Sequence, residues 1–254
     1  MGERRHVVIL TDADNTLWDT DDVFVRAQLR LLDSVEAATG KRLGSSNRLE
    51  FVRSFDQSIA AAHHLHLRYP ARMLVCGLEA GLKGEEPAEV AEVVIKGRVF
   101  SSAISEPTIE KILADYFIAL KRTPKLLPGV PEGLSEAKAL AFDVHVITEG
   151  RAEIQRRIIE EHGLSAFLTG VSEITKGPEQ FLRLRRRYGN CEVVVIGDQP
   201  SRDIAPAHAA GCLAVLIPSK FQPLWGRETS KSDADYIADT FLSAITWVVD
   251  RGRT

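Results

Sequence analysis

The stretch Val7-Val-Ile-Leu-Thr-Asp-Ala-Asp-Asn-Thr16 decides the fold, because it joins a short β-branched run to a pair of carboxylates. Residues 7–10 predict a buried strand with acidic residues at its carboxyl end. Runs of the same form recur as VHVIT, VVVI, AVLI and ADYI, at 144–148, 193–196, 214–217 and 234–237. The sequence therefore predicts several buried strands, and polar residues follow the first three of them.

Helical patterns separate the later strands, with apolar positions three or four residues apart at 132–140, 151–162, 178–188 and 203–210. Gly163, Gly189 and Gly211 follow three of these patterns, where a left-handed cap residue is favoured. Strands that alternate with helices predict an α/β fold, with a Rossmann-like parallel sheet and helices on both faces. Ligands bind at the carboxyl ends of the strands in such sheets, which is where the polar residues lie.

Residues 20–124 break this alternation. They contain successive helical patterns at 21–39, 47–69, 70–83, 87–104 and 108–122. An insertion of about 105 residues is the size of a small domain. We therefore expect a catalytic core made of residues 1–19 and 125–254, and an all-helical cap made of residues 20–124. Since the insertion begins just after the first strand, we expect it to cover the carboxyl-end face as a lid.

The composition excludes several classes of function. The 254 residues have 44% hydrophobic content and a net charge of −3, enough for a real core and without the basic excess of a nucleic-acid or membrane-surface binder. No apolar run is long enough to span a bilayer. Residues 1–6 lead straight into a strand, without the apolar region of a signal peptide. Three widely spaced cysteines, at 76, 191 and 212, favour reduced thiols, so we expect a cytoplasmic protein.

Four polar features converge on the predicted strand ends: the pair Asp12 and Asp14, then Thr148, then Lys176, and then the segment from Asp198 to Asp203. One carboxylate of the pair can attack a substrate while the other gives and takes protons. A hydroxyl and an ammonium group can neutralise the oxygens of a phosphoryl group during its transfer. Two acids two residues apart are common in surface loops, so the prediction depends on all four features together.

The same residues predict a metal site. Crowded carboxylates repel one another and resist ionisation, and a hard divalent cation relieves that repulsion. Mg²⁺ takes oxygen ligands and accepts a substrate phosphate as one of them. Asp12 and Asp198, together with the backbone carbonyl of Asp14, are the predicted protein ligands.

The order DxDxT, a strand-end Thr, a Lys and GDxxxxD resembles the haloacid dehalogenase superfamily of hydrolases. The resemblance covers the whole chain, and the helical insertion is similar to the C1 cap of that superfamily in position and helicity. Residues 148–218 most resemble phosphatases of the flavin-mononucleotide and nucleotide type. The resemblance implies that Asp12 is a nucleophile that forms an aspartyl-phosphate, and that Asp14 is the general acid and base.

The resemblance also implies roles for the other residues of the pattern. Thr148 and Lys176 would bind the phosphoryl oxygens, and Lys176 would also hold Asp12. Asp198 would be a metal ligand, and Thr16 would support the loop after the first strand.

Two further positions qualify this pattern. The resemblance implies that Asp203 acts on the water shell of the metal or on Lys176. Asp203 also begins a predicted helix, so a helix N-cap is a competing interpretation. Glu149 follows Thr148, where Asn is frequent in the superfamily, and this departure affects contacts around the phosphate loop.

The leading hypothesis is a Mg²⁺-dependent phosphatase for a small phosphorylated metabolite. A 2-haloacid dehalogenase uses the same first aspartate, but it needs neither a second acid nor Mg²⁺, so Asp14 argues against it. A phosphomutase differs mainly in whether water or a second hydroxyl accepts the phosphoryl group. A non-catalytic binding module on this fold would not require the intact set of polar residues.

Overall fold

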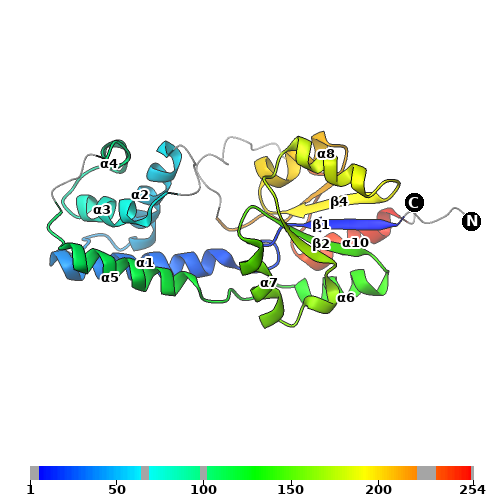
Figure 1. The fold of residues 1–254 in the computed structure, drawn as a ribbon, viewed down its shortest axis with the longest axis horizontal. Coiled ribbons are helices and arrows are strands. Elements are labelled where there is room, and N and C mark those ends of the chain that lie inside the picture. Colours follow the sequence, from blue (N-terminus) through cyan, green and yellow to red (C-terminus); the bar gives the residue numbers. More distant parts are fainter. Residues whose placement is uncertain (1–5, 64–68, 98–101, 222–232, 253–254) are drawn as a thin grey trace, which may run out of the picture. The chain divides into compact units, whose positions relative to one another are not determined.

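The computed structural model describes residues 6–63, 69–97, 102–221 and 233–252 (Figure 1). Its contacts divide the chain into two compact units. The core unit contains the described residues up to Asp21 and those from Thr123 onward, and the helical unit contains the described residues of Asp22–Arg122. In the described residues, no helix is both long and apolar enough to cross a membrane.

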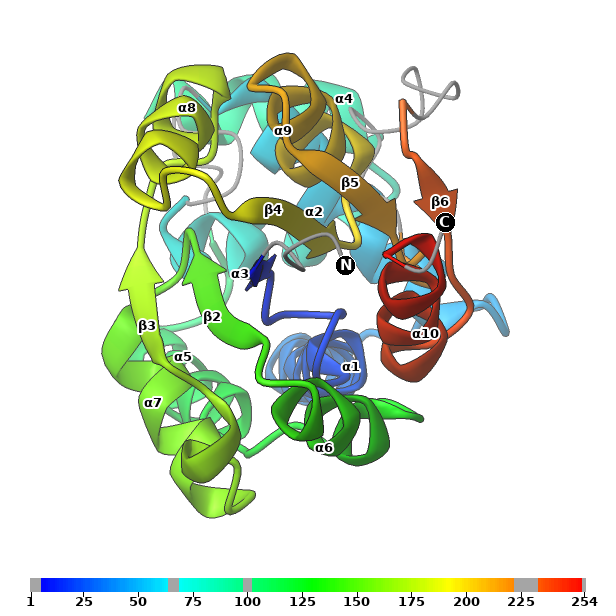
Figure 2. The ribbon, with the colours of Figure 1, turned by 90° about the vertical axis from the view of Figure 1, so that its right-hand side faces the viewer.

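A six-stranded parallel sheet forms the centre of the core unit, as predicted. Its strands are β1 (Val7–Thr11), β2 (Asp143–Thr148), β3 (Gly170–Glu173), β4 (Glu192–Gly197), β5 (Leu213–Leu216) and β6 (Tyr236–Ile237). They lie in the order β3-β2-β1-β4-β5-β6 (Figure 2). Because β1 pairs with β2 on one side and with β4 on the other, the carboxyl ends of these three strands meet at one edge.

Helices cover both faces of the sheet, which confirms the predicted layers (Figure 2). They are α6 (Val130–Ala139), α7 (Ala152–Glu161), α8 (Pro178–Arg187), α9 (Ala205–Ala209) and α10 (Phe241–Arg251). Successive residues of a strand point to opposite faces. Accordingly, Val7 and Ile9 of β1 belong to a cluster with α6, α7 and α10, whereas Val8 and Leu10 belong to a cluster with α8 and α9.

Local structure in the core unit differs from the prediction at two places. Strand β3 was not expected, because Gly-Val-Ser-Glu carries only one strongly apolar residue and its residues are at most half-buried at the sheet edge. The helix predicted over 203–210 instead begins as a π-helical turn at Pro200–Ile204 and continues as α9. The three predicted left-handed glycines are confirmed, with φ angles of 68°, 58° and 74° at Gly163, Gly189 and Gly211.

The helical unit has a hydrophobic core of its own, with Leu32, Phe55 and Leu78 among its fully buried side chains. Its helices are α1 (Thr20–Thr39), which begins in the core unit, α2 (Arg48–Ala62), α3 (Ala71–Gly81), α4 (Pro87–Ile95) and α5 (Glu106–Leu120). The helices expected over 47–69 and 87–104 end earlier, at Ala62 and Ile95, because the described residues 63, 69, 96–97 and 102–104 are not helical. The parts of these predictions that fall on 64–68 and 98–101 lie outside the described residues. The role of this unit as a cap stays a prediction.

Candidate active site

Three neighbouring strands deliver polar side chains to one edge of the sheet. Asp12 follows β1, Thr148 ends β2 and Asp198 follows β4. The backbone N–H of Asp12 donates to the carbonyl oxygen of Ile196 at 2.8 Å, so the pairing of β1 with β4 extends to the aspartate itself. Sheet pairing therefore brings Asp12 and Asp198 together, although they are far apart in the sequence.

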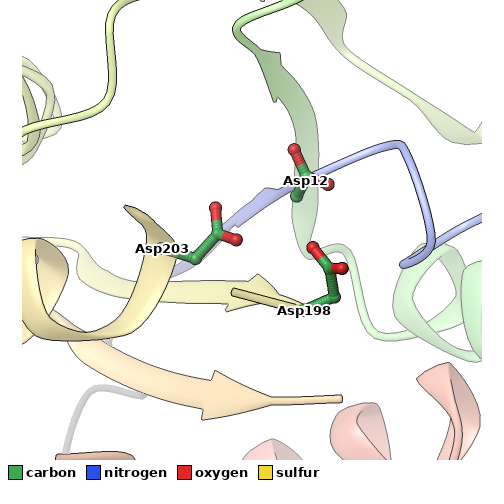
Figure 3. Close-up of side chains that lie close together, drawn as sticks. All are labelled: Asp12, Asp198 and Asp203. Atoms are coloured by element: carbon green, nitrogen blue, oxygen red, sulfur yellow. The ribbon is translucent and has the colours of Figure 1, made fainter. Parts of the chain in front are cut away.

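A cluster of three buried carboxylates lies at this edge (Figure 3). One oxygen from each of Asp12, Asp198 and Asp203 lies within 4.8 Å of the others. These residues are 6%, 2% and 0% exposed. The buried ammonium of Lys176 donates hydrogen bonds to Asp12 and to Asp203. The structure thus brings together four residues that the sequence placed in three separate motifs.

The environment of Asp12 disfavours its negative charge. Burial raises the pKa of Asp12 to about 7, and the nearby carboxylates of Asp203 and Asp14 act in the same direction. The ammonium of Lys176 partly opposes this shift. Asp12 is therefore a carboxylate whose ionised form needs additional positive charge.

Burial also raises the pKa of Asp198 well above its usual range, and the carboxylates of Asp12 and Asp203 add to that shift. Burial has the opposite effect on the pKa of Lys176, because the charged form of lysine is the protonated one. Burial alone would lower the pKa of its ammonium, but Asp12 and Asp203 outweigh burial and raise that pKa above its usual range. Lys176 is consequently a permanent positive charge in this cluster.

A π-helical turn and a glycine place Asp203 in the cluster. The turn begins at Pro200 after Gln199, so Asp203 lies inside it and the N-cap interpretation is wrong. The backbone N–H of Gln199 donates to Asp203 Oδ2 at 3.1 Å. A Cβ atom added to Gly197 would lie 2.3 Å from Asp203 Cγ, which is far inside van der Waals contact. Gly197 therefore permits this approach, a role that its position before Asp198 in the sequence did not reveal.

Two neutral donors hold Asp14 apart from the cluster. The hydroxyl of Thr20 donates to Asp14 Oδ1 at 2.6 Å, and the Gln155 amide donates to Asp14 Oδ2 at 2.9 Å. Sequence reasoning missed both partners. Gln155 is 3% exposed on α7, so a polar residue on the buried face of an amphipathic helix was the available signal. The carboxylate of Asp14 is therefore bound separately from the three clustered aspartates.

The two threonines of the predicted site lie in different settings. Thr148 is 1% exposed, and its Oγ1 accepts a hydrogen bond from the N–H of Gly150 at 2.9 Å. Its own hydroxyl proton therefore remains for another acceptor. Thr16 Oγ1 is buried and has no hydrogen-bond partner among the described residues. The loop is closed instead by its backbone, where the N–H of Leu17 donates to the carbonyl oxygen of Ala13 at 2.9 Å.

The donor set fits a hard divalent cation. Asp198 Oδ1 is buried and has no hydrogen-bond partner in the described part of the chain. A buried carboxylate oxygen without a donor is costly unless a cation faces it. Carboxylate oxygens are the ligands that Mg²⁺ prefers. Asp12, Asp198 and Asp203 are thus the side chains placed to hold such an ion. Each carboxylate oxygen of Asp14 already accepts a hydrogen bond, so its backbone carbonyl remains the predicted ligand from that residue.

Fold and site together define an α/β protein with a cluster of buried carboxylates at the carboxyl edge of a parallel sheet. The chain belongs to the haloacid dehalogenase-like hydrolase family, whose model matches residues 7–211. The family that the sequence motifs resembled is therefore confirmed.

Similarity to individual proteins agrees with this membership. A phosphoglycolate phosphatase of Photobacterium profundum is 27% identical over 128 residues, or 47% of this chain and 55% of that protein. A phosphoserine phosphatase of Thermus thermophilus is 27% identical over 138 residues, or 50% of this chain and 55% of that protein. The chain thus spans about half the length of the curated relatives it matches. A haloacid dehalogenase-like hydrolase of Xanthomonas campestris shares the fold, with a TM-score of 0.64, 20% identity and full coverage of both chains.

Proposed function

We propose that this protein is a Mg²⁺-dependent phosphatase that hydrolyses a small phosphate monoester through an aspartyl-phosphate on Asp12. The observation that carries the proposal is the division of labour between two carboxylates on one loop. Asp12 lies in the buried cluster with Lys176, whereas Asp14 is held by Thr20 and Gln155. This arrangement supports Asp12 as the nucleophile and Asp14 as the general acid and base.

In the first step, a carboxylate oxygen of Asp12 attacks the phosphorus atom of the ester. The bond from phosphorus to the ester oxygen breaks, and Asp14 gives its proton to the departing oxygen. Lys176 and the Thr148 hydroxyl neutralise the charge on the phosphoryl oxygens, which is the main requirement of phosphoryl transfer. The products of this step are an alcohol and a phosphorylated Asp12.

In the second step, water attacks the phosphorus atom of the aspartyl-phosphate, and Asp14 takes up the proton that the water loses. The bond between phosphorus and Asp12 breaks, which restores the carboxylate and releases inorganic phosphate. Asp12, Asp198 and Asp203 would hold Mg²⁺, which when bound offsets negative charge on the carboxylates and on the phosphate.

The names of the two curated relatives support the substrate class, because both are phosphatases of small phosphate esters. We propose a small phosphorylated metabolite as the substrate and the helical unit as the cap that selects it. The connectivity supports a cap, since the helical unit is inserted directly after the loop that carries both catalytic aspartates. The free thiols of Cys76, Cys191 and Cys212 support a cytoplasmic setting.

A direct test is the hydrolysis of an aryl phosphate by purified protein, with Mg²⁺ and with a chelator, followed by a screen of phosphorylated metabolites that includes phosphoglycolate and phosphoserine. We expect hydrolysis that requires Mg²⁺ and is lost in Asp12→Asn. No release of phosphate from any ester in the presence of Mg²⁺ would overturn the proposal. Release of halide from a 2-haloacid would instead favour the dehalogenase alternative.

A further inference from the structure

Glu149 makes a set of contacts that its departure from the family pattern did not predict. Its carboxylate accepts a hydrogen bond from Arg202 Nε at 2.8 Å and a second one from the Arg202 terminal nitrogen Nη2. It also accepts the backbone N–H of Lys176 at 3.0 Å. The interaction of a guanidinium with a carboxylate through two nitrogens is both strong and geometrically specific.

These contacts join three separate segments of the core unit. Glu149 follows β2, Lys176 lies beyond β3, and Arg202 belongs to the π-helical turn and directly precedes Asp203. The regular pairing of β2 with β3 ends where the N–H of Ile174 donates to the carbonyl oxygen of Thr148. Beyond that point, the hydrogen bond from the Lys176 N–H to Glu149 holds the backbone of the segment after β3.

We propose that Glu149 and Arg202 form a brace that positions Lys176 and Asp203 for phosphoryl transfer, an inference that rests on the proposed function. The ammonium of Lys176 must reach Asp12 and Asp203 together, and the brace fixes the backbone beside both Lys176 and Asp203. The positive guanidinium also neutralises Glu149, so the extra carboxylate adds little repulsion toward an anionic substrate.

The side chain of Glu149 suits this role better than the Asn that is frequent at this position. An ionised carboxylate has two oxygens that only accept, so it can receive all three hydrogen bonds at once. The Asn side chain is shorter, is uncharged and has a single accepting oxygen. The brace acts through Lys176 and Asp203, which makes Glu149 and Arg202 positioning residues.

The first test is steady-state kinetics with an aryl phosphate at saturating Mg²⁺. Removal of a group that orients site residues typically costs about 10- to 100-fold in activity, so we expect Glu149→Ala to lower kcat within that range. KM should change less than kcat, because the brace acts on residues of the chemical step. Glu149→Gln keeps an acceptor for the Lys176 N–H and should retain more activity than Glu149→Ala.

A matched control is available at Glu153. Its carboxylate pairs with Arg151 at 3.1 Å in a pair that is 68% and 81% exposed. Exposed pairs of this kind contribute little, so Glu153→Gln should leave kcat unchanged. The coupling between Glu149→Ala and Arg202→Ala should be strong, with the double variant only slightly less active than either single variant.

Hydrogen exchange of the Lys176 amide tests the brace without reference to activity. Loss of its acceptor should speed exchange at that amide about tenfold or more in Glu149→Ala, since exchange reports local opening. Exchange should stay unchanged in Glu153→Gln. If the alanine variant does not fold, Glu149→Gln serves the same test. It keeps an acceptor for the Lys176 N–H but loses the charged pair with Arg202, so exchange at that amide should be faster than in the natural protein by a smaller factor than in Glu149→Ala.

The two proposals fail separately. Absence of any phosphatase activity in the natural protein would remove the proposed function, while faster exchange in the Glu149 variants would still establish the brace as a structural element. Conversely, an active enzyme whose Glu149→Ala variant keeps its kcat and its slow Lys176 exchange would overturn the brace and leave the phosphatase intact.

Discussion

The helical unit and the core unit both bury carboxylates, but they surround them in opposite ways. In the helical unit, the fully buried side chain of Glu36 accepts two hydrogen bonds from Arg48 at 3.0 Å and one from the N–H of Leu43 at 2.8 Å. The hydrogen bonds from Arg48 are the largest cause that lowers the pKa of Glu36. In the core unit, burial raises the pKa values of Asp12 and Asp198.

This difference separates a structural carboxylate from a functional one. Glu79 in the helical unit repeats the structural case, because Lys83, Ser102 and the N–H of Ala103 all donate to it. A carboxylate whose oxygens all accept hydrogen bonds from the chain needs no cation or ligand to balance its charge. In the core cluster, by contrast, Asp198 Oδ1 has no donor among the described residues, and we propose that a cation balances this carboxylate.

The largest expected effect is on kcat, when one carboxylate in each unit is replaced by its amide. Asp12→Asn should reduce kcat by a factor on the order of 10⁴ or more, because loss of a nucleophile removes the covalent step. Glu36→Gln should leave the kcat of the folded protein unchanged, since Glu36 lies in the other unit's structural network. Residual activity of Asp12→Asn near that of the natural protein would assign the nucleophile elsewhere.

A side chain added at Gly197 should disturb the close packing of Asp203 against strand β4. Gly197→Ala would force a shift of Asp203, and we expect a loss of activity of about 100-fold together with about 2 kcal/mol of destabilisation. Gly44→Ala is the control, because no atom lies within 4 Å of a Cβ at that position. Kinetics and denaturant unfolding of both variants check this, and equal behaviour of the two would contradict the described packing.

Stability without metal should change in opposite directions in the two units. Asp198→Asn removes a buried charge whose Oδ1 lacks a donor, so the free energy of unfolding in a chelator should rise. Glu36→Gln weakens charge-assisted hydrogen bonds from Arg48, so the free energy of unfolding should fall by about 2 kcal/mol. We expect Mg²⁺ to stabilise the natural protein, and Asp198→Asn should abolish that stabilisation. A fall in stability for both variants would mean that the core cluster is balanced without a cation.

A further comparison of the two units is the dependence of stability on pH in a chelator. The pKa of Asp12 is about 7 in the folded chain against an ordinary value of 3.8, so between these values the folded state holds a proton that the unfolded state has lost. The free energy of unfolding should therefore fall as pH rises from about 4 to about 7. Asp12→Asn should show a shallower fall, because only Asp198, whose pKa burial also raises, then contributes in this direction. Glu36, whose pKa is lowered, should contribute stability that is lost as pH falls below 4.5. Denaturant titrations across pH check both signs.

The sequence was sufficient for the parts of the molecule that depend on local pattern. Strand and helix alternation predicted the parallel sheet, since β-branched runs and 3.6-residue periods are visible in a single sequence. The short edge strand β3 was missed because its residues are half-buried and polar. Left-handed glycines after three helices were predicted because only the local cap geometry decides them.

The motif residues of the site were also visible, but their supporting contacts were not. The hydrogen bond from Gln155 to Asp14 spans 141 residues, and that from Arg202 to Glu149 spans 53. Such partners are chosen by the fold, because each becomes a neighbour only after the strands have paired. The same reason hid the role of Gly197, which depends on where the π-helical turn places Asp203.

The most direct test of the central claim is to trap the phosphorylated enzyme. Asp14→Asn should still accept a phosphoryl group from an aryl phosphate in the presence of Mg²⁺ but should hydrolyse it slowly, because no base at position 14 takes the proton of the water. Acid quenching followed by peptide mass spectrometry would locate the group. We predict one phosphoryl group on the peptide that contains Asp12. Turnover of the ester with the phosphoryl group on another residue, or on none, would contradict the assignment of Asp12 as the nucleophile.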